Sequence, residues 1–361
     1  MYLHERKNWT EFTWDGRVVA PLLGDARFAQ GKLLGRLEDV GFDLSREIEV
    51  GFLCGEVIAS SEIEGVTLDA AKVRSSVARR LGADQLVSMD NTSDVDGAVD
   101  MVLDAVRKCN EPLTAERLFS WHAALFPTGY SGLRKIEVAR YRTTPMQVVS
   151  GPIGRERIHF EAPAPNDVPA LMQDFISWFN AEPEDDLLVK AALAHLWFLT
   201  VHPFEDGNGR IARALTETLL AKSDASSRRF YSMARYIEAN RDEYYKAIER
   251  AQKGTSDVTS WLTWFLSAVK GAIEASAEEL SAVLAHSSFW AAIDSVPLND
   301  RQRKVLSLLA GDFEGKLTAK KWAKICKVSP DTALRDINDL VAKGMLKRDP
   351  AGGRSTSYSL R

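Results

Sequence analysis

The sequence of 361 residues has few cysteines and no long hydrophobic run. Its three cysteines, Cys54, Cys109 and Cys326, are odd in number and far apart, which excludes a disulfide framework and a Cys-x-x-Cys zinc site. No apolar run approaches the ~20 residues of a membrane-spanning helix. The first residues, MYLHERKNWTEFTW, lack the apolar core of a signal peptide. We therefore expect a cytoplasmic protein that makes no membrane contact.

Histidine is also scarce. The six histidines form no His-x-x-x-His set, which argues against a hydrolytic metal site. His195 precedes His202 by seven residues but lies in an apolar stretch, so we expect it in the core.

The net charge is small but unevenly distributed. The chain carries a formal −4, yet Lys316 to Arg361 holds eleven Lys or Arg against four Asp, a net of +7, which leaves −11 for residues 1–315. A basic segment on an acidic body predicts a separate module. The length predicts two or three domains, and 45% hydrophobic with 27% charged residues is typical of a globular protein.

Apolar residues at helical spacing predict a mainly α fold. An amphipathic stretch in the first 40 residues precedes helices expected over 43–60, 68–82, 98–109, 113–126, 166–180, 186–201, 211–222, 240–253 and 258–285. Residues 186–201 are apolar nearly all round, which is typical of a buried central helix. The Gly-, Pro- and Arg-rich segment 130–165 instead holds the β-prone pieces QVVSG and RIHFE, which predict a β-hairpin or flap.

The C-terminal residues follow a different pattern, which begins near Leu298. Three helices, the last with Ser329 as N-cap and Pro330 at its first position, precede two short strands around a Gly-Gly turn. This order is typical of a winged helix-turn-helix. We expect an N-terminal helical domain over 1–110, a core over 111–285 and a winged-helix domain over 290–361.

The stretch HPFEDGNGR, His202 to Arg210, forms the loop between two expected helices. The free N–H groups of the second helix carry partial positive charge, and Arg210 and Arg213 add cations where the helix dipole disfavours them. Gly207 and Gly209 allow close backbone approach. This combination predicts a polyphosphate site. The alternative is a capped interhelical turn with a stray histidine.

Three further residues of the loop add chemistry. Asp206 offers one hard oxygen, and Mg²⁺ commonly takes one or two carboxylates with substrate phosphates and water. His202 titrates near neutral pH and can accept a proton from a hydroxyl nucleophile. Phe204 is expected to point inward and anchor the loop.

HPFEDGNGR followed by Arg213 resembles the Fic signature HPFx(D/E)GNGRxxR at every specified position. The resemblance covers most of the chain: a Fic core from about residue 112 to 270, a preceding helical domain and a winged-helix companion. It implies a protein adenylyltransferase, which moves AMP from ATP to a Ser, Thr or Tyr hydroxyl of a protein and releases pyrophosphate. The implied partner is a target protein, or the chain itself.

The resemblance also implies residue roles. His202 would be the base and Asp206 the Mg²⁺ ligand, and the ATP phosphates would be held by the loop that Phe204 anchors, through Gly207, Asn208, Gly209, Arg210 and, for the γ-phosphate, Arg213. Tyr244 and Tyr245 would line the nucleoside pocket, with core packing as the alternative. Segment 147–161, with Val148 and Val149, resembles the flap along which a target aligns as an added strand.

The stretch SSEIEG, residues 60–65, is by itself a helix C-terminus with a solvated acid. It resembles the Fic inhibitory motif (S/T)xxxE(G/N), with Ser60, Glu64 and Gly65 on the specified positions. The resemblance implies that Glu64 pairs with Arg213 and so inhibits the enzyme.

Two alternatives stay open. Residues 298–361 are a candidate DNA-binding module of a transcriptional regulator, with Ser329–Lys343 as recognition helix and RST near the wing tip. With such a regulator, the Fic core would act in self-modification, or in AMP removal with Glu64 positioning a water. The same module could instead make protein contacts or form a homodimer.

Overall fold

The structure is a computed structural model that describes residues 1–38, 40–89, 91–150, 155, 157–294, 296–310, 313–350 and 356–361, with side chains except at 43, 84, 285–294 and 310. The chain divides into two compact units, Met1–Ala277 and Glu278–Arg361. The expected boundary between residues 110 and 111 stays a prediction, because both sides of it lie in the first unit.

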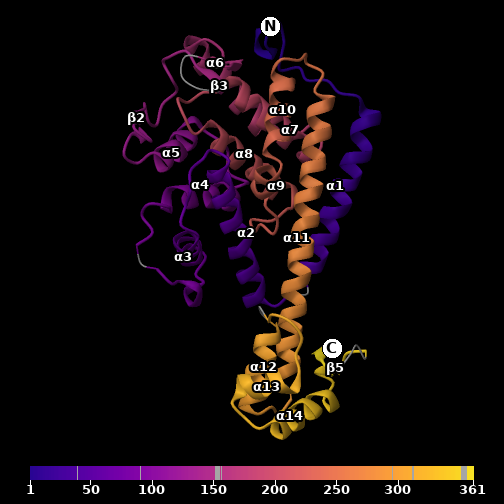
Figure 1. Cartoon of the computed structure of the whole chain (residues 1–361). Coiled ribbons are helices and arrows are strands. Elements are labelled where there is room, and N and C mark those ends of the chain that lie inside the picture. The colour runs from indigo at the N-terminus through magenta and orange to yellow at the C-terminus, as the bar shows by residue number, and fades with distance from the viewer. Residues whose placement is uncertain are drawn as a thin grey trace. The chain divides into compact units, whose positions relative to one another are not determined.

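Helices dominate the first unit, which confirms the mainly α fold (Figure 1). They are α1 (Gly16–Leu37), α2 (Phe42–Glu62), α3 (Ala70–Arg80), α4 (Asp96–Arg107), α5 (Ala115–Leu125), α6 (Val168–Asn180), α7 (Leu187–Val201), α8 (Asn208–Ser223), α9 (Met233–Ala239), α10 (Arg241–Gln252) and the first part of α11 (Thr259–Asp294). The short α9 was not expected, since seven residues give little periodicity. α11 continues beyond the expected end at residue 285.

Helix α7 is the centre of this unit, as its all-round apolar sequence predicts. Every residue from Leu188 to Val201 is buried, and α7 packs against α8, α6 and α10. Asp186 caps its first turn by accepting the Leu188 N–H at 2.8 Å. His195 lies in the core, as expected, between the hydroxyls of Tyr244 and Thr216 at 2.8 Å each.

Two buried carboxylates fix helix α2 to its neighbours. They are Glu49, which accepts from Arg107 and Arg228, and Glu56, which accepts from the Ser232 hydroxyl and the Ala234 N–H, all at 2.7–2.9 Å. Burial raises the pKa of Glu56, while these two donors lower it. A buried carboxylate left without its donors is costly, so these contacts hold α2 firmly in place.

The expected flap is an antiparallel pair, β3 (Gln147–Ser150) and β4 (Arg157–Glu161), with an irregular register between Val148 and Val149. The connecting residues 151–154 and 156 lie outside the described residues. A second hairpin, β1 (Tyr130–Ser131) with β2 (Arg134–Lys135), was not expected, because two-residue strands leave no alternating pattern. Buried Phe160 of β4 packs against Tyr2 and His4 near the N-terminus.

The second unit has its own core, formed by α12 (Asp300–Ala310), α13 (Ala319–Cys326), α14 (Pro330–Ala342) and the antiparallel pair β5 (Leu346–Arg348) and β6 (Tyr358–Leu360). Trp322, Ile337 and Leu346 lie in this core. Ser329 caps α14 by accepting the Thr332 N–H, as expected. The order of elements agrees with the sequence, while the winged-helix assignment stays a prediction. The Gly-Gly turn, Arg354 and Ser355 lie outside the described residues.

Candidate functional site

The loop between α7 and α8 is closed by its own side chains. His202 ends α7 in the left-handed region, with φ 50° and ψ 60°, and Gly207 begins α8 with φ 82°. The Asn208 amide bridges both backbone groups of Phe204, accepting its N–H at 3.0 Å and donating to its carbonyl at 2.8 Å. Phe204 is fully buried and stacks on His122 at a centroid distance of 4.3 Å. Phe204 thus anchors the loop, and the Asn208 side chain makes its hydrogen bonds inside the loop.

The half-buried imidazole of His202 is held as a neutral base. Its Nδ1 lies 3.3 Å from the Leu199 carbonyl, which can only accept, so Nδ1 carries the proton and Nε2 keeps its lone pair. Burial lowers the pKa of His202 to about 4 and outweighs the Leu199 bond, which raises it. The ring is therefore unprotonated at neutral pH and can take a proton from a nearby donor.

The first two turns of α8 hold guanidinium nitrogens that lack hydrogen-bond partners. Among the described residues, no side chain caps this helix. Arg210 Nε and Arg213 Nη1 are buried, and neither has a hydrogen-bond partner among the described residues. Buried donors are normally satisfied, so these two indicate a missing acceptor. Free helix N–H groups with two guanidinium groups can hold an anion such as a phosphate.

Asp206 lies beside this turn with a partly exposed carboxylate. Its Oδ1 accepts the Gly207 N–H at 2.5 Å and lies 4.0 Å from Arg210 Nη2, while Oδ2 accepts the Ser131 hydroxyl. Within the described ranges, no cluster of three His, Cys, Asp or Glu side chains could chelate a metal by itself. The site therefore offers one hard oxygen for a cation that takes its other ligands from substrate and water.

Residues 60–65, which we call the brake segment, meet Arg213. Its guanidinium donates from Nε to the Ser60 hydroxyl at 2.8 Å and from Nη2 to the Ser60 carbonyl at 2.7 Å and to Glu64 Oε1 at 2.8 Å. The ion pair expected between Glu64 and Arg213 is thus present. Glu64 lies two residues after Glu62, the last helical residue of α2, and Gly65 comes next with φ 76°.

Glu64 also lies against Gly209. A Cβ added to Gly209 would come 2.1 Å from Glu64 Oε1 and 3.3 Å from Arg213 Nη1. The missing side chain of Gly209 therefore leaves the space that the carboxylate occupies.

The two tyrosines of α10 have different surroundings. Tyr244 is 1% exposed and its hydroxyl pairs with buried His195, so the structure favours core packing over a place in a nucleoside pocket. Tyr245 is exposed, donates to the Ile63 carbonyl at 3.3 Å and lies under the Arg241 guanidinium. Of the two, Tyr245 alone is available at the surface beside the brake segment.

Three residues around the loop escaped the sequence reasoning. Ser131 bonds Asp206, His122 stacks on Phe204 and accepts the Ala139 N–H, and Arg142 donates to the His202 carbonyl. They lie 60–82 residues before the loop residues Asp206, Phe204 and His202 that they contact, so no local spacing could connect them. The position of Arg142 just before the flap was the one available signal.

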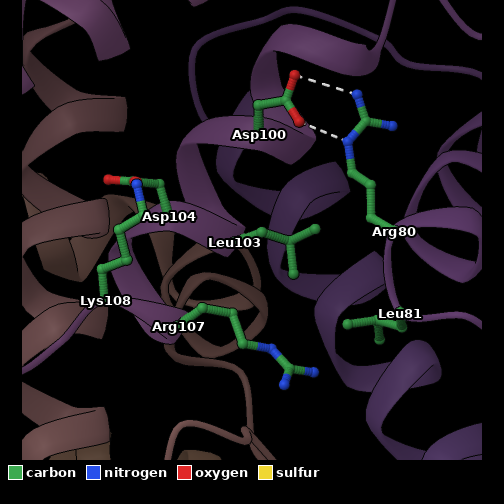
Figure 2. A pocket seen from close by; sticks show the side chains of 7 residues that line it. All are labelled: Arg80, Leu81, Asp100, Leu103, Asp104, Arg107 and Lys108. Carbon is green, nitrogen blue, oxygen red and sulfur yellow. Dashed lines mark hydrogen bonds and ion pairs between the residues drawn. The ribbon is translucent and has the colours of Figure 1, made fainter.

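A separate hollow between α3 and α4 carries no such chemistry (Figure 2). Its cations are paired: Arg80 with Asp100, Lys108 with Asp104, and Arg107 with Glu49. None of its lining residues belongs to the loop.

Comparison with known proteins agrees with this geometry. Residues 112–220 match the Fic/DOC family, and residues 2–83 match a domain of unknown function, DUF4172. A Fic family protein from Desulfovibrio desulfuricans has a similar fold over 94% of this chain and 96% of its own, with a TM-score of 0.53 and 19% identity. Residues 112–220 therefore form a Fic domain. The motif loop lies in the Fic match and the brake segment in the DUF4172 match.

Other Fic proteins are similar over shorter stretches. A Bacteroides thetaiotaomicron Fic-domain signaling protein covers 70% of this chain with a TM-score of 0.51 and 18% identity. Protein adenylyltransferase Fic of Drosophila grimshawi is 28% identical over 53% of this chain, and a probable protein adenylyltransferase of Aquifex aeolicus is 33% identical over 26%. These matches span 36% and 29% of the two relatives' own lengths. In the described part of this Fic protein, no helix has the length and apolarity to cross a bilayer.

Proposed function

We propose that this Fic-domain protein transfers AMP from ATP to a hydroxyl of a protein, and that the state described here is the inhibited one. The observation that carries the proposal is the pair of buried, unpartnered nitrogens, Arg210 Nε and Arg213 Nη1, at the N-terminus of α8 beside a neutral His202. The adenylyltransferase names of the relatives support the choice of reaction.

The triphosphate would lie along the first turn of α8. The free N–H groups of that turn would bind the α- and β-phosphates, with Arg210 beside them, and Arg213 would bind the γ-phosphate. Gly207 must be glycine there, because it has φ 82° and a Cβ would come 2.9 Å from the Phe126 ring. The contribution of Asn208 would come from its backbone, since its amide is used by Phe204.

In the reaction, His202 Nε2 accepts the proton of the target Ser, Thr or Tyr hydroxyl. The hydroxyl oxygen forms a bond to the α-phosphorus as the bond from that phosphorus to pyrophosphate breaks. The proton then passes from His202 to solvent. A positioned base of this kind contributes typically about 10²–10⁴-fold to the rate.

Asp206 fits a Mg²⁺ ligand, because its carboxylate is partly exposed beside the proposed phosphate site. Bound Mg²⁺ would neutralise charge on the phosphates. Ser131 holds Asp206 Oδ2, so this hydroxyl would orient the carboxylate or yield to the ion.

The brake segment would act by occupying Arg213. Glu64 Oε1 accepts a hydrogen bond from one nitrogen of the guanidinium and fills the space beside Gly209. The γ-phosphate would need both that nitrogen and that space. ATP bound beside Glu64 would be displaced at its α-phosphate, and a misplacement of about 1 Å can cost ~10²-fold in rate.

The target would dock on the flap. Within the described residues, β3 pairs only with β4, which leaves its other edge free for an added strand. Val148 and Val149 of β3 are 37% and 47% exposed and would contact that strand. Tyr245 would contact the nucleoside, whereas Tyr244 would act through the core.

The test uses purified full-length chain with ATP labelled in the adenine or in the γ-phosphate. Wild type and Glu64→Gly are incubated with Mg²⁺, and the intact protein is weighed. We expect one or more added AMP groups, more on Glu64→Gly than on wild type, and none on Glu64→Gly with His202→Ala. Label transfer from the γ-phosphate, or no mass gain on any variant or added protein, would overturn the proposal.

A second candidate function is DNA binding by residues 298–361, which the net of +7 over Lys316–Arg361 favours. The exposed residues of α14 speak against base reading by this helix, since Asp331, Leu334, Arg335 and Asn338 provide one cation. Protein contact in a homodimer fits that face as well. A salt-dependent mobility shift on the chain's own promoter DNA tests the DNA proposal, and no shift at low salt would reject it.

AMP removal is the other open activity, with Glu64 positioning a water. Incubating AMP-modified protein with wild type and Glu64→Gly distinguishes it, because removal would need Glu64 whereas transfer would not.

A further inference from the structure

We propose that Arg142 is a positioning residue, which fixes the backbone of His202 relative to both ends of the flap and so sets where the base meets the target hydroxyl. The proposal rests on the AMP-transfer function and adds a residue to it that lies outside the motif loop.

The Arg142 side chain is 2% exposed, and its hydrogen bonds within the described residues all go to backbone carbonyls. Nε donates to His202 at 2.8 Å, Nη1 to Thr144 at 3.0 Å, and Nη2 to Pro163 at 2.7 Å and to Val201 at 3.4 Å. The Arg142 N–H donates to the Pro203 carbonyl at 2.9 Å. One residue therefore satisfies acceptors on three separate segments.

These acceptors come from the places that must be aligned for transfer. Val201 ends α7 and His202 follows it, so their carbonyls lack intrahelical donors. Thr144 lies three residues before β3, and Pro163 lies two residues after β4. The planar guanidinium thus joins the base to both stems of the flap on which the target would dock.

The backbone of His202 needs such support. A non-glycine residue in the left-handed region is strained and persists only where its surroundings hold it. Arg142 binds the carbonyl of His202 itself and, through its own N–H, that of Pro203. Without Arg142, buried carbonyls lose their donors and the imidazole loses its fixed direction relative to β3.

The charge of Arg142 also acts on His202. No carboxylate pairs with Arg142 in the described part of the chain, so its cation faces the negative end of the α7 dipole and the imidazole. Of the charged groups facing His202, Arg142 lowers the pKa of the imidazole, while Glu64 and Asp206 raise it. Arginine is required by this geometry, because the single ammonium group of a lysine cannot reach carbonyls on three segments.

The experiment compares Arg142→Lys and Arg142→Met, both in the Glu64→Gly background, with Arg27→Met as a matched control. Arg27 binds Asp186, Gln30 and Ser223 in the same unit, and none of these three residues belongs to the loop. Rates are divided by the folded fraction, measured by circular dichroism. We expect kcat to fall about 10²-fold for both Arg142 variants with KM for ATP nearly unchanged, because the base moves and the phosphate site does not.

The acidic limb of the pH–rate profile distinguishes a role of Arg142 in positioning His202 from a loss of folded protein. Loss of the cation in Arg142→Met should move this limb to higher pH than in Glu64→Gly with Arg142 intact, whereas Arg142→Lys should lose rate with a smaller shift. Unfolding alone would lower the apparent rate without moving the limb. The imidazole pKa is also read directly, from the ¹³C resonance of labelled His202 in the absence of ATP.

Three results would overturn the proposal: a kcat per folded protein equal to that of Arg27→Met, a raised KM at unchanged kcat, or an unshifted limb in Arg142→Met. If Arg142→Met does not fold, Arg142→Lys is decisive, and an unchanged kcat rejects the proposal. If Glu64→Gly itself transfers no AMP, the proposed function fails. The His202 titration then decides alone: an unchanged ¹³C resonance and pKa in the Arg142 variants reject the positioning role as well.

Discussion

The motif loop, His202–Arg213, and the brake segment, Ser60–Gly65, touch at one guanidinium but are held in different ways. The loop is fixed by buried Phe204, by the Asn208 side chain bound to the Phe204 backbone, and by Arg142, which binds the His202 carbonyl from outside the loop. Glu64 lies beyond the end of α2, is partly exposed and attaches through one carboxylate oxygen. The residues proposed to act in the reaction are therefore held in a rigid loop, whereas the proposed inhibition depends on the side chain of Glu64.

Substitution within the loop frame should give the largest effect. Phe204→Ala removes a fully buried ring that stacks on His122 and should lower the free energy of unfolding by about 3–5 kcal/mol. Urea unfolding followed by circular dichroism measures this. Val148→Ala, on the exposed flap, is the control and should change stability little. A small loss for Phe204→Ala would show that the loop is not a rigid frame.

Substitution at the brake should change rate more than stability. Glu64→Gly should raise self-modification by about 10²-fold, since Arg213 is freed for the γ-phosphate. Its unfolding free energy should fall by less than that of Phe204→Ala. Glu62→Gly, whose spacing does not match the inhibitory motif, is the control. An equal gain in both variants would mean that Glu64 has no special role.

A weaker effect is expected at Ser60. Ser60→Ala removes the hydroxyl bound to Arg213 Nε but leaves the carbonyl and Glu64 in place. One such hydrogen bond is worth about 1 kcal/mol, so activity should rise roughly fivefold. The measurement is the initial rate of AMP incorporation at fixed ATP. A gain as large as that of Glu64→Gly would shift the control from the ion pair to Ser60.

Mild acid should have the smallest effect. His202 acts while unprotonated, and burial lowers its pKa to about 4 from an ordinary 6.5. Glu64 raises this pKa, so its removal lowers the pKa further, and the kcat of Glu64→Gly should not fall on account of His202 above about pH 4. A pH–rate profile at saturating ATP and Mg²⁺ measures this, and loss of activity around pH 6.5 would contradict it.

The sequence predicted elements formed by neighbouring residues better than contacts between residues far apart in the chain. The loop between two helices, the buried α7, the β3–β4 pair and the capped α14 follow from local periodicity and cap residues. The Glu64–Arg213 pair was reached through a family motif, because its partners are 149 residues apart and no spacing rule covers that separation. Arg142, in an irregular segment, and Ser131, in a two-residue strand, contact loop residues far along the chain, and such short or irregular segments carry no periodicity that could predict these contacts. Tyr244 shows a further difficulty, since burial distinguishes it from its neighbour Tyr245 and the sequence does not.

The anchoring of α2 has a consequence for timing. Its two buried carboxylates keep the helix in place, so Glu64 can leave Arg213 by rotating its own side chain and the short stretch around Gly65. Side-chain rotations of this kind take picoseconds to nanoseconds, whereas helix displacement takes microseconds or longer. Glu64 and the γ-phosphate of ATP would then alternate on Arg213 many times within one turnover. The fraction of time that each spends there would follow the ATP concentration. The inhibited enzyme would therefore keep a low basal rate that rises with the ATP concentration.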